Sequence, residues 1–234
     1  MKNLFLYIIL FIIIVLFVLF LIGNKINNKN FIFDNRKLFF EKYNNILNNN
    51  ILNYNNYKAS HDPNNCNVNN WYFDVVDNFL TNEECDKIIE RSRNNLSNSE
   101  VANNMKNVRT SSQVWFEKKK NPIFEKISKK VSKKTNLPIE NQEKIQILNY
   151  QPGQFYKHHF DNCLSHDSDC NKLKKGTNER KITTFIYLND VEDGGETSFN
   201  NIGIKVKPKK GMAIFWSNLS KDNGDEFCSL HEAL

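Results

Sequence analysis

Residues 182–188 read Ile-Thr-Thr-Phe-Ile-Tyr-Leu, residues 202–206 read Ile-Gly-Ile-Lys-Val, and residues 212–216 read Met-Ala-Ile-Phe-Trp. Each run is short and rich in β-branched and aromatic residues, and turn residues such as Asp193-Gly194-Gly195 and Lys210-Gly211 separate the runs. A series of short strands divided by turns is typical of a β-sandwich or jelly roll. We therefore predict that the second half of the chain is built mainly from strands.

Helices are predicted upstream of these strands. Thr81 and Glu84 form a capping box, which starts a helix that reaches about Arg93. A second helix is expected to start at Asn121-Pro122, since proline is tolerated in the first turn, and to end before Leu137-Pro138. The predicted fold class is α+β, a jelly roll with supporting N-terminal helices.

The N-terminus carries an apolar run from Leu4 to Ile22. As a helix it would measure about 28 Å, close to the thickness of a bilayer core. No small-x-small cleavage site follows, so we expect residues 1–23 to be an uncleaved signal anchor, a single transmembrane helix. The basic residues that follow it favour a cytoplasmic C-terminal domain by the positive-inside rule.

The rest of the chain divides into a stem and a domain. Residues 24–70 are rich in Asn and poor in regular patterning, which predicts a stem, and residues 71–234 are the expected globular domain. The chain has 234 residues, of which 40% are hydrophobic, so one catalytic-size domain with an appendage is possible and wholesale disorder is excluded. The net charge is +6, but Lys and Asn are scattered along the whole chain, which indicates a compositional bias and not a nucleic-acid surface.

The stretch Tyr156-Lys157-His158-His159-Phe160-Asp161 holds the candidate chemistry. On a strand, His159 and Asp161 share a face and His158 points to the other. A His-x-Asp pair with one distant His is the ligand set of a non-haem Fe(II) centre, which leaves positions open for cosubstrate and O2. The distant ligand must be His61, His166 or His231, and His231 is preferred because the pattern around it alternates. On its own the pair is weak evidence, because a His-x-Asp occurs often by chance on a surface strand with solvated polar residues.

Further motifs occur in a fixed order around this pair. They are Asp77-Asn78-Phe79-Leu80-Thr81-x-Glu83-Glu84-Cys85, Arg109-Thr110-Ser111, Tyr150-x-x-Gly153-x-x-Tyr156-x-x-His159-x-Asp161, Arg180-x-x-Thr183, Tyr187-Leu188, Gly194-Gly195-Glu196-Thr197-x-Phe199 and Pro208-x-x-Gly211-x-Ala213-x-x-Trp216. The pattern resembles the prolyl 4-hydroxylase family of 2-oxoglutarate- and Fe(II)-dependent dioxygenases, in its collagen-type and plant-type catalytic subunits. The resemblance covers roughly residues 72–234.

The resemblance implies a fold, a reaction and a set of site residues. The implied fold is a double-stranded β-helix, and the implied reaction hydroxylates a peptidyl proline to 4-hydroxyproline while 2-oxoglutarate and O2 give succinate and CO2. Ascorbate is the usual reductant of such enzymes. The implied iron ligands are His159, Asp161 and His231; Tyr150, Tyr187 and Thr183 would lie near 2-oxoglutarate, and Arg109 and Tyr156 would lie on the peptide side. For Arg109, a place on the surface of a strand is an equal alternative.

The end of the chain departs from this family. In relatives, a Lys that pairs with the far carboxylate of 2-oxoglutarate follows the distal His, whereas Glu232-Ala233-Leu234 follow His231 here. The final strand with its Lys is therefore expected to be missing, His231 is expected to fray, and turnover and iron binding are expected to be weak. The alternative function is a membrane-anchored dioxygenase-like fragment that binds peptide or metal without turnover.

Other motifs bear on the compartment. Cys163 and Cys170 could form a disulfide, bind zinc through the intervening His166, or remain as thiols. Asn95-Leu96-Ser97 and Asn218-Leu219-Ser220 match the N-glycosylation acceptor, although such matches arise readily by chance in an Asn-rich chain. Family habit predicts a domain in the lumen of the endoplasmic reticulum, against the flanking charges, with a proline-containing protein or peptide as partner.

Overall fold

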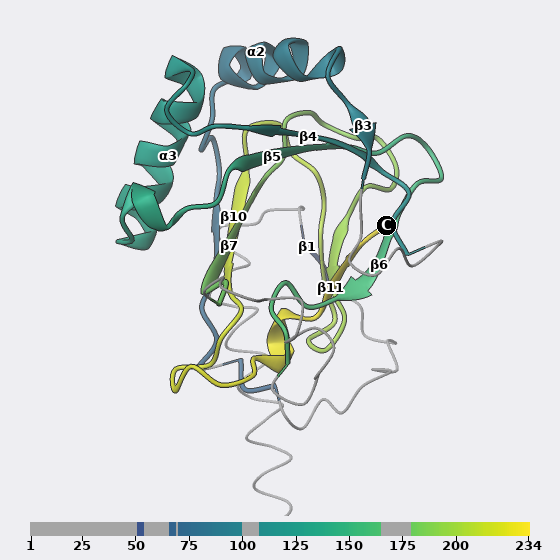
Figure 1. Ribbon diagram of the computed structural model, residues 1–234. Helices are drawn as coiled ribbons and strands as arrows, with labels where there is room; N and C mark the ends of the chain where they lie inside the picture. The colour runs from purple at the N-terminus through teal and green to yellow at the C-terminus, as the bar shows by residue number, and fades with distance from the viewer. Residues whose placement is uncertain (1–50, 54–65, 69, 100–107, 165–178) are drawn as a thin grey trace, which may run out of the picture. The chain divides into compact units, whose positions relative to one another are not determined.

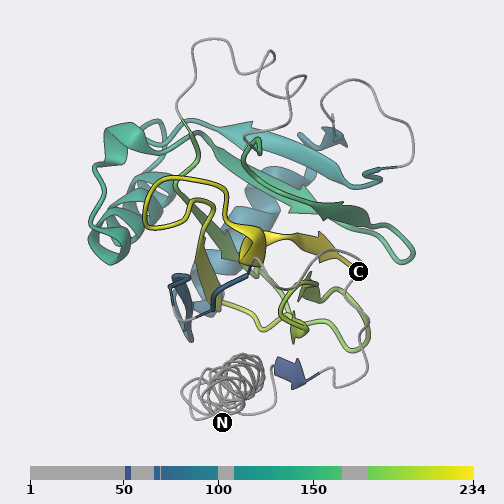
Figure 2. The same cartoon turned by 90° about the horizontal axis from the view of Figure 1, so that it is seen from below.

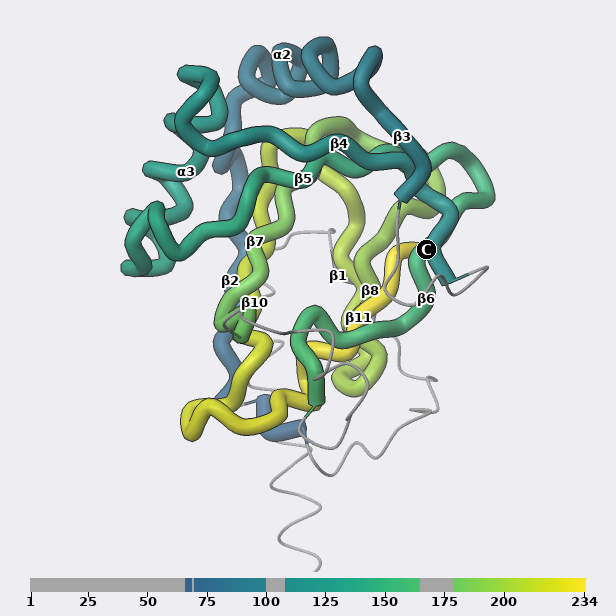
Figure 3. The backbone as a smooth tube through the Cα atoms, viewed as in Figure 1, coloured from purple at the N-terminus to yellow at the C-terminus, as the bar shows by residue number. Residues whose placement is uncertain are grey.

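The computed structural model describes residues 51–53, 66–68, 70–99, 108–164 and 179–234. Its strands form a five-stranded sheet and two three-stranded sheets, and the strand pairs within them are antiparallel. Figure 1 and Figure 3 show the two helices packed outside the strands, next to the β4–β5 pair. The strand-rich second half and the upstream helices agree with the architecture predicted from the sequence.

The two described α-helices are α2 (Asn82–Arg93) and α3 (Pro122–Thr135), and both begin at the predicted caps. The Thr81 hydroxyl accepts from the backbone N–H of Glu84, and the Glu84 carboxylate accepts from the N–H of Thr81. Asn121 caps α3 by accepting from the N–H of Ile123. Short 3-10 turns, η3 (Ile139–Asn141) and η4 (Phe227–Ser229), precede β5 and β11.

One three-stranded sheet has the order β2-β10-β7, with bounds Phe73–Val76, Ala213–Ser217 and Ile182–Ile186. The central strand β10 is buried on both of its faces. Ala213 and Phe215 pack against the helices in a core that α2 and α3 complete. Trp216 points to the opposite face, where it contacts Phe199 edge-to-face with ring centroids 5.2 Å apart. The side of the sheet away from the helices is therefore an aromatic interior.

The five-stranded sheet has the order β1-β9-β8-β11-β6. Its strands are β1 (Ile51–Asn53), β9 (Ile204–Val206), β8 (Thr197–Phe199), β11 (His231–Ala233) and β6 (Tyr156–His159). Figure 2 shows β11 as the yellow arrow next to the C-terminus, and in the sheet this strand lies between β8 and β6. The third sheet has the order β3-β4-β5, with bounds Ser97–Asn98, Ser112–Phe116 and Ile145–Asn149.

Two parts of the expected stem contact the domain that follows it. β1 pairs with β9, and Cys66 is bonded to Cys228. Among the described residues no helix is long and apolar enough to cross a membrane. The apolar run Leu4–Ile22 lies outside the described residues.

Candidate metal centre

Three potential metal ligands converge at the ends of neighbouring strands. His159 ends β6, Asp161 follows it, and His231 opens β11, where it pairs directly with His159. Asp161 Oδ1 lies 3.7 Å from His159 Nε2, and Asp161 Oδ2 lies 3.9 Å from His231 Nε2. The potential ligand atoms all lie within 4.8 Å of one another. The structure therefore brings together the three residues that the sequence pattern selected.

Each imidazole is held in a defined tautomer. His159 Nδ1 lies 2.8 Å from the carbonyl oxygen of Lys157, and His231 Nδ1 lies 2.8 Å from that of Ser229. A carbonyl oxygen only accepts, so Nδ1 donates in both rings, and in a neutral imidazole with this hydrogen bond Nε2 carries the lone pair. Both Nε2 atoms are the ones nearest Asp161. This is the arrangement in which a histidine binds a metal ion through Nε2.

The protonation states also suit a metal ion. Burial, with a smaller contribution from the neighbouring His231, lowers the pKa of His159 to about 3. Burial by itself raises the pKa of Asp161, but His231, His159 and the Thr183 hydroxyl lower it, and the net shift is downward. At neutral pH the site therefore holds a neutral imidazole and an ionised carboxylate, as metal binding requires. Two imidazoles and one carboxylate on one side fit Fe(II) with open positions opposite them.

A layered stack leads from His159 toward Arg109. The ring of Tyr156 stacks on that of His159 with centroids 3.6 Å apart, and the guanidinium of Arg109 lies 4.7 Å from the Tyr156 ring centroid. Arg109 also donates from Nε to the Ser111 hydroxyl at 3.0 Å. Arg109 and Tyr156, the predicted peptide-side residues, thus lie together on one side of a ligand.

An ion pair flanks Asp161. Arg180 donates from Nε and Nη2 to the two carboxylate oxygens of Glu143, at 2.5 and 2.9 Å. Its Nη1 lies 3.9 Å from Asp161 Oδ1. The side chains of Arg180 and Glu143 are about half exposed, at 46% and 53%. This pair therefore presents charge to solvent next to the candidate ligand.

The predicted 2-oxoglutarate residues occupy different environments. Tyr187 is buried, and its hydroxyl lies 2.7 Å from Thr197 Oγ1 and 3.2 Å from the carbonyl oxygen of Val206. Burial raises the pKa of Tyr187, so the phenol is neutral. Thr183 donates to Asp161 Oδ2 at 2.6 Å, a contact that the sequence did not predict. Tyr150 directly follows β5 and is partly buried. Cosubstrate contact by these three residues stays a prediction.

The segment around His231 is held firmly. β11 pairs with β6 on one side and with β8 on the other, and His231 is only 7% exposed. Leu234 continues the pairing through backbone hydrogen bonds with Gly195 and Glu196. The expectation that His231 would fray is therefore wrong, because both edges of its strand are hydrogen-bonded. His61 and His166, the other candidates for the distant ligand, lie outside the described residues.

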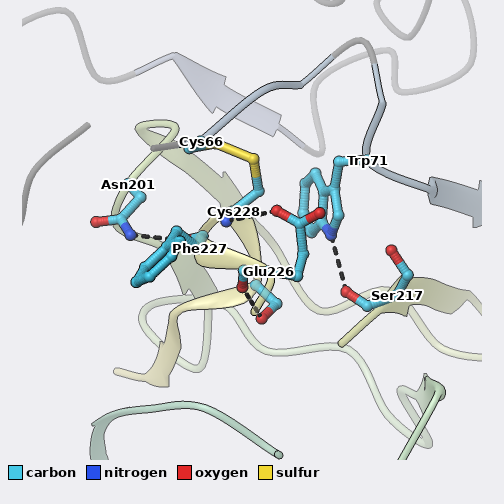
Figure 4. Close-up of a disulfide and its surroundings, with 8 residues drawn as sticks. Cys66, Trp71, Asn201, Ser217, Glu226, Phe227 and Cys228 are labelled. Carbon is cyan, nitrogen blue, oxygen red and sulfur yellow. Dashed lines mark hydrogen bonds between the residues drawn. A yellow bond between two sulfur atoms is a disulfide. The ribbon is translucent and has the colours of Figure 1, made fainter. Parts of the chain in front are cut away.

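The cysteines form a link that sequence reasoning missed. Figure 4 shows the Cys66–Cys228 disulfide, with Cys228 in η4 just before β11. Cys163 is also disulfide-bonded, which contradicts the zinc and free-thiol alternatives for Cys163. No local signal in the sequence identifies the Cys66–Cys228 pair.

The two glycosylation acceptors differ in exposure. Asn95 is exposed just after α2, whereas Asn218 is 3% exposed and its amide donates to Thr183 Oγ1 at 2.7 Å. Of the two asparagines, the folded domain therefore presents Asn95 alone to solvent.

Comparison with known proteins identifies the family to which this sequence is similar. Residues 145–234 match the 2OG-Fe(II) oxygenase superfamily. The chain is 38% identical over 184 residues to prolyl 4-hydroxylase 2 of Arabidopsis thaliana, covering 67% of this chain and 60% of that protein. It is 34% identical over 125 residues to the human prolyl 4-hydroxylase subunit alpha-1, covering 53% of this chain and 23% of that protein.

A solved structure supports the same grouping. The viral collagen prolyl hydroxylase of Paramecium bursaria Chlorella virus 1, solved with 2-oxoglutarate, aligns with a TM-score of 0.57 and 30% identity. The alignment covers 70% of this chain and 87% of that one. By contrast, the chain spans 60% and 23% of the Arabidopsis and human relatives named above.

Proposed function

This chain belongs to the prolyl 4-hydroxylase family of 2-oxoglutarate- and iron(II)-dependent oxygenases, and we propose that it hydroxylates a proline residue in a protein or peptide to 4-hydroxyproline. The observation that carries the proposal is the convergence of His159, Asp161 and His231, with both Nε2 atoms facing the carboxylate. These three side chains are the ones that would hold iron(II).

The chain's own residues define how the site would work. The Nδ1–H bonds to backbone carbonyls keep His159 and His231 in the binding tautomer, and the interior aromatics Phe199 and Trp216 pack against His231. His231 is buried and His159 and Asp161 are partly buried, which limits access of water to the centre. When bound, iron(II) and 2-oxoglutarate supply the oxidation, in which O2 inserts one oxygen atom into the substrate and the other into succinate, with release of CO2.

The substrate side is proposed to be the partly exposed surface around the stack and the ion pair. Tyr156 and Arg109 form an amphipathic face against which a proline ring and its flanking peptide groups can lie. Arg180 and Glu143 offer a donor and an acceptor for peptide backbone groups beside Asp161. Ascorbate, the family's usual reductant, would keep the iron in its reduced state.

The proposal is tested with the purified chain, Fe(II), 2-oxoglutarate, ascorbate and a proline-rich peptide. We expect succinate release that depends on the peptide, and a mass gain of one oxygen atom on proline. A peptide with Ala in place of Pro and the Asp161→Ala variant are the controls, and both should abolish the gain. Metal binding without peptide oxidation would instead support a non-catalytic binding role, and oxidation of a lysine would indicate a different peptidyl hydroxylase.

We also propose that the domain lies in the lumen of the endoplasmic reticulum, anchored by the apolar run Leu4–Ile22. The disulfides of Cys66, Cys228 and Cys163 support an oxidising compartment. Protease added to the cytosolic side of sealed microsomes should then leave the domain intact, and complete digestion would contradict the proposal. Asn95→Gln, and not Asn218→Gln, should remove any glycosidase-sensitive mass, because the Asn218 amide is buried.

A further inference from the structure

A chain of hydrogen bonds runs behind the candidate metal ligand Asp161. Thr183 on β7 places its hydroxyl 2.6 Å from Asp161 Oδ2, and Asn218 places its amide nitrogen 2.7 Å from the same hydroxyl. Asn218 directly follows β10, and its backbone N–H donates to the carbonyl of Lys181 at 3.0 Å. The pairing of β7 with β10 therefore fixes the positions of both Thr183 and Asn218.

The direction of these hydrogen bonds follows from chemistry. A metal-binding carboxylate is deprotonated and only accepts, so the single hydroxyl proton of Thr183 goes to Asp161. The Thr183 oxygen is then free to accept, and the amide of Asn218 supplies the donor. An aspartate or an apolar residue at position 218 could not complete the chain. Each bond to Asp161 that involves its charge is of the stronger, charge-assisted kind.

The burial of Asn218 argues against a purely structural role. Its side chain is 3% exposed, and its Oδ1 atom has no hydrogen-bond partner within the part of the chain that the structure describes. Burying an amide with an unmet acceptor destabilises the folded state, and an apolar residue at this position would avoid that cost. The benefit that offsets it is the hydrogen bond to Thr183.

We propose that Thr183 and Asn218 are positioning residues, which fix the plane of the Asp161 carboxylate relative to the two imidazoles and thereby set the affinity for the divalent metal. The inference rests on the metal site of the proposed function and deepens it. Outer partners of metal ligands typically change metal affinity about 10- to 100-fold when they are removed. Asn218 acts through Thr183 and does not itself face the ligand oxygens, so its removal should have the smaller effect.

The experiment measures the Kd for Mn(II) of the full chain by calorimetry, without substrate. Thr183→Val, which keeps the shape and removes the hydroxyl, should weaken binding about tenfold or more, whereas Thr183→Ser should stay within about threefold of the unchanged protein. Asn218→Leu should weaken binding about three- to tenfold. The double variant Thr183→Val/Asn218→Leu should be no weaker than Thr183→Val, because the two residues act in one chain.

A matched control separates positioning from stability. Ser92→Ala removes another buried hydroxyl, which donates to the Ile88 carbonyl in α2, and should lower the melting temperature without changing the Mn(II) Kd. The visible absorption of the Co(II)-substituted protein should shift in Thr183→Val and not in Ser92→Ala, since it reports ligand geometry.

The outcomes separate the positioning role of Thr183 and Asn218 from the proposed hydroxylation. Unchanged Mn(II) affinity in Thr183→Val and Asn218→Leu would overturn the positioning role. The expected affinity pattern without any peptide oxidation would uphold it and count against hydroxylation. Failure of the unchanged chain to bind Mn(II), Co(II) or Fe(II) would overturn both.

Discussion

His158 and His159 are adjacent in the chain, yet only His159 faces the candidate metal. His158 is exposed, whereas the Nε2 atom of His159 lies 3.7 Å from Asp161 Oδ1. The alternation of side chains on a strand separates the two histidines, and this rule is local, so the sequence suffices to apply it. The alternation also survives the end of β6 at His159, because Asp161 still turns toward the same side.

The adjacent histidines provide a direct test of the site. His159→Ala or Asp161→Ala should reduce Mn(II) or Fe(II) affinity by at least about 100-fold, because each removes a ligand. His158→Ala should leave the affinity within about twofold. Calorimetric titration with Mn(II) measures all three variants under the same conditions. Loss of metal in His158→Ala with retention in His159→Ala would show that the strand register is different.

The roles of Thr183 and Asn218 were beyond prediction from sequence. The sequence predicts Thr183 beside 2-oxoglutarate and offers Asn218 only as a glycan acceptor. In the structure, Thr183 donates to Asp161 and Asn218 donates to Thr183. The separations along the chain are 22 residues from Thr183 to Asp161 and 35 from Asn218 to Thr183. Such contacts depend on the register between β7 and β10, and the sequence patterns of single strands carry no information about that register.

At the scale of elements, α2 and α3 were predictable because their signals are local. The capping box at Thr81 and the Pro at the start of α3 lie within the helices or directly beside them. The order of the strands in the sheets was not predictable. The five-stranded sheet places β11 between β8 and β6, which are remote from each other in the chain.

Glu84 connects the two helices, and its charge makes their packing depend on pH. Burial by itself raises its pKa, but hydrogen bonds from Lys126, the Thr81 N–H and Lys130 outweigh burial and lower the pKa to about 2. A lowered pKa in the folded state means that the ionised form stabilises the fold above the unfolded pKa of about 4.5. This contribution is lost as the pH falls from about 4.5 toward about 2.

We therefore expect Glu84→Gln to destabilise the fold at pH 7 by up to about 3 kcal/mol. Gln at this position can still accept from the Thr81 N–H, so the variant removes the charge and keeps the capping box. Urea unfolding of both proteins at several pH values measures the difference, which should shrink as the pH falls below about 4.5. A difference that stays constant down to pH 2.5 would mean that the charge of Glu84 contributes nothing.

Gly211, in the turn before β10, lies directly against the backbone of the segment that leads into α2. It has a positive φ of 81°, and a Cβ at this position would lie 2.3 Å from the carbonyl oxygen of Leu80. Leu80 also donates its N–H to the Gly211 carbonyl at 3.0 Å, so the two backbones cannot separate without losing that bond.

Gly211→Ala should therefore destabilise the fold by about 3 kcal/mol or more, because it combines backbone strain with a clash. Gly153→Ala is the matched control, since Gly153 has a φ of 80° and no atom within 4 Å of an added Cβ. It should lose only about 1–2 kcal/mol, from the backbone conformation alone. Equal losses of unfolding free energy in the two variants would show that the close approach to Leu80 is relieved at little cost.

At the scale of the whole domain, a disulfide joins the segment before β2 to the turn before β11. The Cys66–Cys228 disulfide spans a sequence separation of 162 residues, and Cys228 is fully buried. Around it, Glu226 caps η4 by accepting from the Cys228 N–H, and Trp71 donates from its indole to the carbonyl of Ser217 (Figure 4). The segment that enters β2 is thereby fastened to the turn that precedes β11.

This bond should stabilise both the fold and the metal site. Closing so long a loop is worth about 3–5 kcal/mol in the chain-entropy account, so Cys66→Ala should lower the free energy of unfolding by roughly that amount. Cys66 is remote from His231 in sequence, whereas Cys228 lies just before it, so any loss of Mn(II) affinity in Cys66→Ala must pass through the cross-link to η4 and β11. We expect a loss of about three- to tenfold, because η4 supplies the Ser229 carbonyl that holds the His231 ring.

Two controls identify the cause of this loss. The double variant Cys66→Ala/Cys228→Ala should match Cys66→Ala in Mn(II) affinity, which shows that the free Cys228 thiol is not the cause. Added reductant should weaken Mn(II) binding further only if the Cys163 disulfide also contributes. Unaltered stability and Mn(II) affinity in Cys66→Ala would mean that hydrogen bonds such as those of Asn201 and Glu226 to η4 hold the distal ligand without help from the disulfide.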